Sequence, residues 1–155
     1  MKQVYLPIFI LFTITIIRAD VVDIKADHFY ANDINKVAYF EGNARIKQGV
    51  NEFRASKILV HFNRKKKATK YEAEGGVNFN IVEGGINYTG KAQKITYSPN
   101  SSKYYFYGNV ILQDLTNNRK IEAGKISLDL KTGLADIKGE KQRPVHFIFE
   151  IEDRK

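Results

Sequence analysis

A short phrase centred on glycine returns four times along the chain, and this repeat constrains the fold more than any other feature. The copies are the segments 39–44 (YFEGNA), 73–77 (AEGGV), 106–110 (FYGNV) and, more weakly, 137–139 (IKG). Their glycines, Gly42, Gly75, Gly108 and Gly139, are 33, 33 and 31 residues apart. A fixed spacing of this size indicates a supersecondary unit that is repeated along the chain.

A second phrase travels with the first and consists of an alanine followed three residues later by an apolar residue. The pairs are Ala26/Phe29, Ala55/Ile58, Ala92/Ile95 and Ala123/Ile126. From each alanine to the next repeated glycine the distances are 16, 20, 16 and 16 residues. The long interval contains the basic run Arg64-Lys65-Lys66-Lys67, so a four-residue loop insertion accounts for it.

The glycine phrase lies in segments where apolar and polar residues alternate, which is the pattern of a half-buried β-strand. Ala38, Phe40, Gly42, Ala44 and Ile46 share one face of such a strand. The repeated glycine is therefore predicted on the apolar face, where it leaves a gap in the side-chain layer that widens the interior, or lets another backbone or a ligand come close. The last clear strand is predicted over Val145 to Ile151, and no window of ten or more residues after the first 19 has a helical period.

The alanine phrase changes the alternation. Phe53 and Ala55 share one parity, whereas Ile58, Val60 and Phe62 share the other. A continuous strand would turn its second half away from the core, and a bulge or tight bend restores the facing. We therefore expect a bend just after each of these alanines. Seven turn signals separate the expected strands: Asn32-Asp33, Gln48-Gly49, Asn63 to Lys67, Glu83 to Gly85, Ser98 to Asn100, Thr116 to Asn118, and Lys131 to Gly133.

The N-terminal segment has the composition of a secretory signal peptide. Lys2 precedes a 14-residue apolar run from Val4 to Ile17, and Arg18-Ala19 then leads into a polar sequence. The run is shorter than the roughly 20 residues that span a bilayer. We predict residues 1–19 as a signal peptide and residues 20–155 as a single domain. An uncleaved membrane anchor is the alternative interpretation.

Charge and composition narrow the class of function. Without Lys2 and Arg18 the formal net charge falls from +8 to +6, which favours an anionic partner such as nucleic acid, an anionic lipid or an acidic protein. Export makes nucleic acid the least favoured of these, and we predict no nucleic-acid partner. The chain contains no cysteine, so a thiol nucleophile is excluded.

No pattern of catalytic or metal-ligating residues is evident, and neither an enzyme activity, a metal nor a cofactor is predicted. His28, His61 and His146 lie more than 30 residues apart and are interpreted as surface residues. Glu72 and Glu74 share a strand face and are interpreted as cross-strand partners of lysines. The basic run Arg64 to Lys67 is either a solvated hairpin loop or a contact for phosphates or carboxylates of an anionic ligand.

A row of repeated antiparallel strands is buried either in a closed barrel or in a roll of two packed layers, and a roll leaves strand edges unpaired. At this point the phrases resemble those of the OstA-like, or LptA, family. The resemblance rests on Phe40-x-Gly42-Asn43-Ala44 followed by Phe53-x-Ala55-x-x-Ile58, and on Tyr107-Gly108-Asn109-Val110 followed by Ile121-x-Ala123-x-x-Ile126. It covers most of Val22 to Phe149, and its repetition makes it specific.

The resemblance implies an all-β fold, an open antiparallel β-jelly-roll built from repeated short strands. It also implies a periplasmic bridge protein that carries lipopolysaccharide from the inner to the outer membrane of Gram-negative bacteria. Acyl chains would lie in a hydrophobic interior, while sugars and phosphates stay outside. The implied partners are an LptC-type inner-membrane protein, an LptD-type outer-membrane protein and further copies of the chain, joined head to tail through strand edges.

The apolar faces of the expected strands supply a candidate lipid-binding interior. Its members are Phe40, Ile46, Ile58, Val60, Phe62, Val77, Phe79, Ile95, Val110, Leu112, Ile126, Leu128 and Phe147. Two alternatives remain beside the soluble carrier. One is a membrane-anchored LptC-type component, and the other is a structural β-repeat protein whose apolar residues simply fill a closed core.

Overall fold

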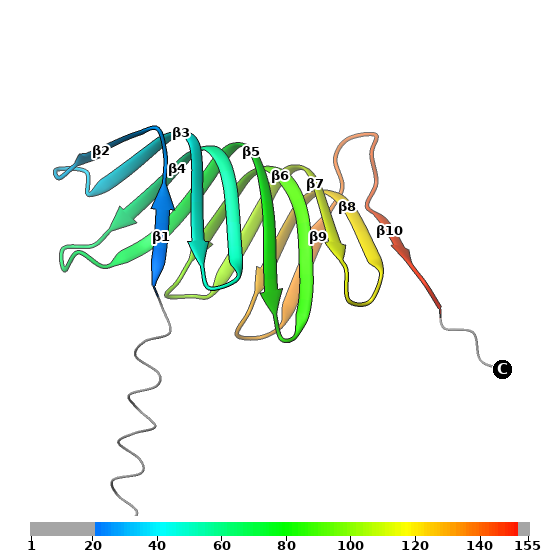
Figure 1. Cartoon of the computed structure of the whole chain (residues 1–155). Coiled ribbons are helices and arrows are strands. Elements are labelled where there is room, and N and C mark those ends of the chain that lie inside the picture. Colours follow the sequence, from blue (N-terminus) through cyan, green and yellow to red (C-terminus); the bar gives the residue numbers. More distant parts are fainter. Residues whose placement is uncertain (1–20, 152–155) are drawn as a thin grey trace, which may run out of the picture.

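The structure, a computed structural model, describes residues 21–151, and the predicted signal peptide lies outside this part of the chain. The described residues form ten strands in one antiparallel sheet (Figure 1). The strands are β1 (Val22–Lys25), β2 (His28–Asn32), β3 (Val37–Gln48), β4 (Asn51–Phe62), β5 (Ala68–Glu83), β6 (Ile86–Ser98), β7 (Lys103–Asp114), β8 (Arg119–Asp129), β9 (Leu134–Lys138) and β10 (His146–Phe149). Between residues 21 and 151 there is no helix long and apolar enough to cross a membrane.

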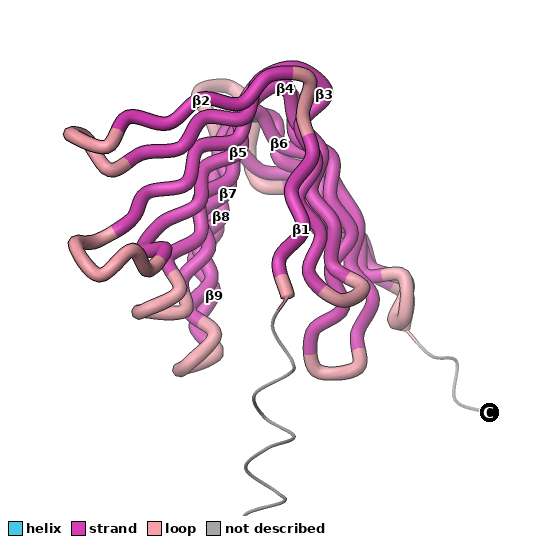
Figure 2. The backbone as a smooth tube through the Cα atoms, turned by 60° about the vertical axis from the view of Figure 1, so that its left-hand side comes forward, coloured by secondary structure: helices cyan, strands magenta, loops and turns pink. Residues whose placement is uncertain are grey.

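The sheet is folded over itself, so that each long strand from β3 to β8 runs through two layers that meet at a common corner (Figure 2). We call the layer that ends in β2 and β9 the first limb and the layer that ends in β1 and β10 the second limb. β2 pairs with the first half of β3 and β1 with its second half. In the same way, β10 pairs with the first half of β8 and β9 with its second half. The predicted open antiparallel roll is therefore confirmed.

The corner is made by the repeated phrases. The register shifts between Glu41 and Ala44 of β3, between Glu74 and Val77 of β5 and between Tyr107 and Val110 of β7. At each shift two residues face one residue of the neighbouring strand, which is a β-bulge that bends and twists the strand. The bulge pairs are Gly42-Asn43, Gly75-Gly76 and Gly108-Asn109, and all six residues have positive φ. The opposing residues are Ser56, Gln93 and Gly124.

Those opposing residues directly follow Ala55, Ala92 and Ala123, so the predicted bend after each alanine is confirmed. The alanine side chains lie on the inside of the corner, where Ala55 and Ala92 are buried. A small side chain suits this position because the two limbs converge there.

The prediction that the repeated glycines line and widen the interior is wrong. A Cβ on Gly75 would lie 2.6 Å from the Cβ of Ser56, and a Cβ on Gly108 would lie 2.6 Å from the Cδ of Gln93. Ser56 and Gln93 are exposed side chains on the outside of the corner. The prediction assumed that successive side chains alternate between the two faces of the strand, and the positive φ of the bulge residues interrupts this alternation.

The hairpin turns lie where the sequence signals place them. The strand breaks fall at residues 33–36, 49–50, 63–67, 84–85, 99–102, 115–118 and 130–133. The last strand is shorter than predicted, because β10 pairs only with Arg119 to Glu122 of β8, and Val145, Glu150 and Ile151 lie outside it.

The core fills the space just inside the corner. Its largest fully buried side chains are Phe79, Phe106, Ile58, Ile126, Val77 and Val110. Phe79 and Phe106 pack with ring centroids 5.2 Å apart. Since these side chains come from both limbs, their packing holds the limbs together at the corner and leaves open space only farther from it.

Candidate functional site

The largest apolar hollow lies between the limbs toward β10. Its volume is about 400 Å³. The apolar lining includes Ile81, Leu112 and Ile121 from the second limb, Leu128 and Ile137 from the first limb, and Phe147 from β10. Both limbs therefore contribute a wall to it.

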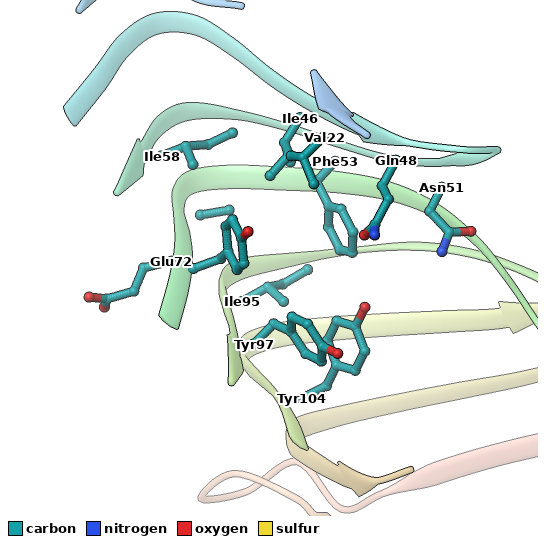
Figure 3. A pocket seen from close by; sticks show the side chains of 12 residues that line it. Val22, Ile46, Gln48, Asn51, Phe53, Ile58, Glu72, Ile95, Tyr97 and Tyr104 are labelled. Carbon is teal, nitrogen blue, oxygen red and sulfur yellow. The ribbon is translucent and has the colours of Figure 1, made fainter. Parts of the chain in front are cut away.

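A second, smaller hollow of about 60 Å³ lies toward β1 (Figure 3). Val22, Ile46 and Phe53 line it from the second limb, and Ile95, Tyr97 and Tyr104 line it from the first. Tyr104 also lines the larger hollow. The two hollows thus share a wall residue and lie side by side between the limbs, and we refer to them together as the groove.

Aromatic rings form much of the first-limb wall of the groove. Tyr71, Tyr97 and Tyr104 are matched in the register of β5, β6 and β7. The rings of Tyr97 and Tyr104 stack 4.3 Å apart, and Tyr104 reaches Phe53 of the opposite limb at 6.3 Å. Burial raises the pKa of the Tyr71 and Tyr104 hydroxyls above their usual value. These side chains therefore stay neutral and offer an apolar ring with a polar tip.

The tip of the second limb carries one satisfied ion pair beside the groove. Asp114 Oδ1 accepts a hydrogen bond of 2.9 Å from the backbone of Asn117, and Asp114 Oδ2 accepts one of 2.9 Å from Arg119 Nε. A second donor of the Arg119 guanidinium also contacts this carboxylate. Burial alone would raise the pKa of Asp114, but these bonds outweigh it and lower the pKa to about 2. The carboxylate is thus fully paired and adds no free charge to the groove.

The thirteen predicted interior residues differ in burial and in whether they line the groove. Twelve belong to the core cluster or pack against it, whereas Phe147 is 47% exposed on β10. Seven line the groove: Ile46, Ile58, Ile95, Leu112, Ile126, Leu128 and Phe147. The other six, Phe40, Val60, Phe62, Val77, Phe79 and Val110, line neither hollow. Contact of any of them with a lipid stays a prediction.

Sequence reasoning missed several residues of the groove. Tyr71, Tyr97, Tyr104, Ile121 and Ile137 line it but were not among the predicted residues. Strand alternation contained the signal, because Tyr71 has the parity of Ala73, Tyr97 that of Ile95, and Tyr104 that of Phe106. Extending each apolar face outward from the corner would have included them.

The outer face of the first limb holds the charged residues that the sequence singled out. Glu72 lies 2.5 Å from His61 Nε2 and 3.1 Å from Lys94 Nζ, and its carboxylate points away from the groove (Figure 3). Lys94 also lies 3.9 Å from Glu74. The interpretation of both glutamates as cross-strand partners of lysines is confirmed. Burial alone would raise the pKa of Glu72, but its bonds to His61 and Lys94 and the charge of Lys70 leave it lowered.

The remaining histidines sit beside glutamates at the surface. His28 Nδ1 is 3.9 Å from Glu41, and His146 Nδ1 is 3.4 Å from Glu122. Among residues 21–151, no group of three His, Asp or Glu side chains is arranged to hold a metal ion.

Comparison with known proteins gives a family and a fold. The family model described as "LptA/(LptD N-terminal domain) LPS transport protein" matches residues 23–134. The crystal structure of LptH from Pseudomonas aeruginosa is similar, with a TM-score of 0.73 and 13% sequence identity over 86% of this chain and 98% of that one. LptH is described as the LptA-homologous periplasmic component of the conserved lipopolysaccharide transport device of that organism. No curated protein matches the chain.

Proposed function

The chain belongs to the family of LptA and LptD N-terminal domain lipopolysaccharide transport proteins, and from this premise we propose that it carries lipopolysaccharide with the acyl chains in the groove. The observation that supports this proposal is an apolar groove with a wall from each limb, beside a core that closes only the corner. Each acyl methylene that leaves water for such a groove contributes about 0.8 kcal/mol. A multi-chain lipid can thus be held without any catalytic group.

The proposed place of this carrier is the periplasm, between the inner and outer membranes. The predicted signal peptide supports export, and the periplasmic component LptH supports it by similarity of fold. Sequencing the N-terminus of the protein purified from cells tests the point. A start at Asp20 agrees with a soluble carrier, whereas an intact Met1 on a membrane-bound chain favours the anchored LptC-type role.

The proposed partners are an LptC-type inner-membrane protein, an LptD-type outer-membrane protein and further copies of the chain. Support comes from the two ends of the sheet, where β1 and β2 at one end and β9 and β10 at the other each have one edge that no strand within residues 21–151 pairs with. An unpaired edge offers backbone donors and acceptors for another strand. Joining unlike ends gives an extensible row rather than a closed dimer.

Photo-crosslinking tests the lipid path. A benzoylphenylalanine at position 128 replaces a leucine that lines the groove, and one at position 127 replaces the neighbouring serine on the outer face. We expect lipopolysaccharide adducts from position 128 and few from position 127. Equal labelling at both positions, or none at position 128, would contradict the proposal. Retained self-association without any lipid adduct would favour a structural array.

A further inference from the structure

The seven hairpin turns lie in two rows, one along the free end of each limb (Figure 2). The residues that line the groove come from both limbs, so the groove lies between the two rows. Turns 33–36, 63–67, 99–102 and 130–133 end the first limb, and we call this row the basic rim. Turns 49–50, 84–85 and 115–118 end the second limb, and we call this row the neutral rim. The basic rim holds six lysines and arginines and one aspartate, whereas the turns of the neutral rim contain no charged residue.

Most of this charge lies in one loop, 63–67, whose backbone is held by hydrogen bonds. Asn63 Oδ1 accepts hydrogen bonds from the backbone N–H of Lys65 at 2.8 Å and of Lys67 at 3.1 Å. The backbone N–H of Asn63 also donates to the carbonyl of Lys67 at 2.9 Å. These bonds close the loop around its first side chain, so the backbone positions from which the four cationic side chains extend are set by the loop itself.

The four cations of this loop, Arg64 to Lys67, are exposed and none of them forms an ion pair within residues 21–151. The other two cations of the rim already have protein partners. Lys36 lies 3.7 Å from Asp33, and Lys131 Nζ donates to the carbonyl of Asn100 at 3.1 Å. Four neighbouring like charges repel one another, and binding of an anion would relieve that repulsion.

The loop is continuous with the groove wall. From Lys67, the last residue of the loop, the chain enters β5 at Ala68 and reaches Tyr71, whose ring lines the groove, and four residues of extended chain span about 13 Å. An amphipathic ligand with its chains beside Tyr71 would therefore have its polar end near the basic rim. The tyrosine row lies between the two, with rings suited to chains and hydroxyls suited to a headgroup.

We propose that the basic rim binds the phosphate groups of the carried lipid, so that the lipid travels with its headgroup over the first limb. This inference rests on the proposed function, since it takes the lipid to occupy the groove. The charge difference between the rims gives the ligand one orientation, because the cluster of four cations without an ion pair lies on one side of the opening.

Two matched variants of the full chain test the rim. The rim variant carries Arg64→Gln, Lys65→Gln, Lys66→Gln and Lys67→Gln. The control variant carries Lys25→Gln, Lys91→Gln, Lys125→Gln and Lys141→Gln, which removes the same charge from exposed lysines that form no ion pair within residues 21–151 and lie outside both rims. Both sets are exposed, and equal thermal unfolding by circular dichroism checks that the variants fold.

Each protein, with the photo-probe at position 128, is incubated with phosphorylated or dephosphorylated lipopolysaccharide and, separately, sedimented with phosphatidylglycerol vesicles. We expect the rim variant to lose about tenfold in labelling by the phosphorylated lipid at low salt, with the loss shrinking as salt screens the charges. We expect the control variant to change less than about twofold, as exposed charges remote from the ligand contribute little. With dephosphorylated lipid all three proteins should label alike.

Several outcomes would overturn the inference alone: unchanged labelling of the rim variant, an equal loss in the control variant, or an equal loss with dephosphorylated lipid. A rim variant that loses only its binding to phosphatidylglycerol vesicles would also overturn it and assign the rim to the membrane surface. If neither lipid labels the wild-type chain, the proposed function fails and the inference fails with it.

Discussion

Side chains outside the corner explain why glycine recurs in the repeated phrase. Each repeated glycine of β3, β5 and β7 combines positive φ with a close polar neighbour, which is Asp27, Ser56 or Gln93. Ser56 Oγ also donates a 2.7 Å hydrogen bond to the carbonyl of Gly75. A residue with a Cβ would meet both a backbone penalty and a steric one at these positions.

Gly75 and Gly76 allow the two penalties to be separated. Their φ values are +83° and +80°, but a Cβ on Gly75 would lie 2.6 Å from Ser56 Cβ, whereas one on Gly76 would have nothing within 4 Å. We expect Gly76→Ala to lower the free energy of unfolding by about 1–2 kcal/mol. Gly75→Ala should cost about 1–3 kcal/mol more, because it also crowds the corner. Urea unfolding measures both, and equal losses would contradict the steric account.

Asp114 gives a pH-dependent contribution to stability. Its pKa is about 2 in the folded protein against an ordinary value of 3.8, so the folded state favours the ionised carboxylate. A lowered acid pKa stabilises the protein above the unfolded pKa, and that contribution is lost as the pH falls from about 4 to about 2. Asp114→Asn should therefore unfold at lower urea than wild type at pH 7. The gap should narrow below pH 4, and a gap that stays constant down to pH 2 would rule out this origin.

At the scale of the strand, one row of bulges turns a single sheet into two limbs. Because the bulges of β3, β5 and β7 fall opposite Ser56, Gln93 and Gly124, successive strands bend at the same level. At the two ends of the sheet the strands are interrupted at this corner, between β1 and β2 and between β9 and β10. β10 keeps large apolar side chains at the surface, with Phe149 56% and Ile151 beyond it 82% exposed. An edge strand of this kind is suited to pairing with a strand of another chain.

The edge at β10 predicts self-association that lysines should block. Phe149→Lys with Ile151→Lys places two charges at this end, and we expect it to abolish concentration-dependent oligomers while the monomer stays folded, since both side chains are largely exposed. Val82→Lys is the control, because it changes an exposed apolar residue on β5, in the middle of the sheet. Sedimentation velocity over a range of concentrations measures the effect. Oligomers that persist in the edge variant would show that another surface joins the copies.

At the scale of the whole molecule, packing and charge are distributed unevenly. The corner is filled by side chains from both limbs, while the groove opens farther out. Much of the net charge of +8 lies in the turns of one limb. This arrangement fits an amphipathic ligand, whose chains need an apolar wall and whose headgroup needs a polar border.

Filling the groove tests whether its open space is used. Ala135 lines the hollow of about 400 Å³, and its neighbour Asp136 points to the outer face. Ala135→Trp should reduce lipopolysaccharide labelling from position 128 about tenfold or more, because an added ring occupies space that the acyl chains would need. Asp136→Trp should leave labelling within about twofold of wild type, as it adds the same ring outside the groove. Equal labelling of the two variants would place the lipid elsewhere.

Interactions between residues close in sequence determine much of this architecture, and the sequence alone was enough to predict that part. The alternation of apolar and polar residues predicts the strands. Turn residues such as Gly, Asn and Pro predict the seven turns, and the two repeated phrases predict the level of the corner. Each of these signals is local in the sequence. The same alternation identified most of the buried interior, including Ile58, Phe79 and Ile126. The break of parity after Ala55 was sufficient to predict a bend.

Pairing between distant residues decided the rest. Alternation placed the repeated glycines inside, but the bulge gives them positive φ and turns them toward side chains of the neighbouring strand. Whether an apolar residue fills the corner or lines the groove depends on how far the opposite limb stands from it, which no single strand encodes. The basic run at 64–67 was visible in the sequence, but its place at the groove opening follows only from the fold, because hairpins far apart in the chain end side by side at one rim.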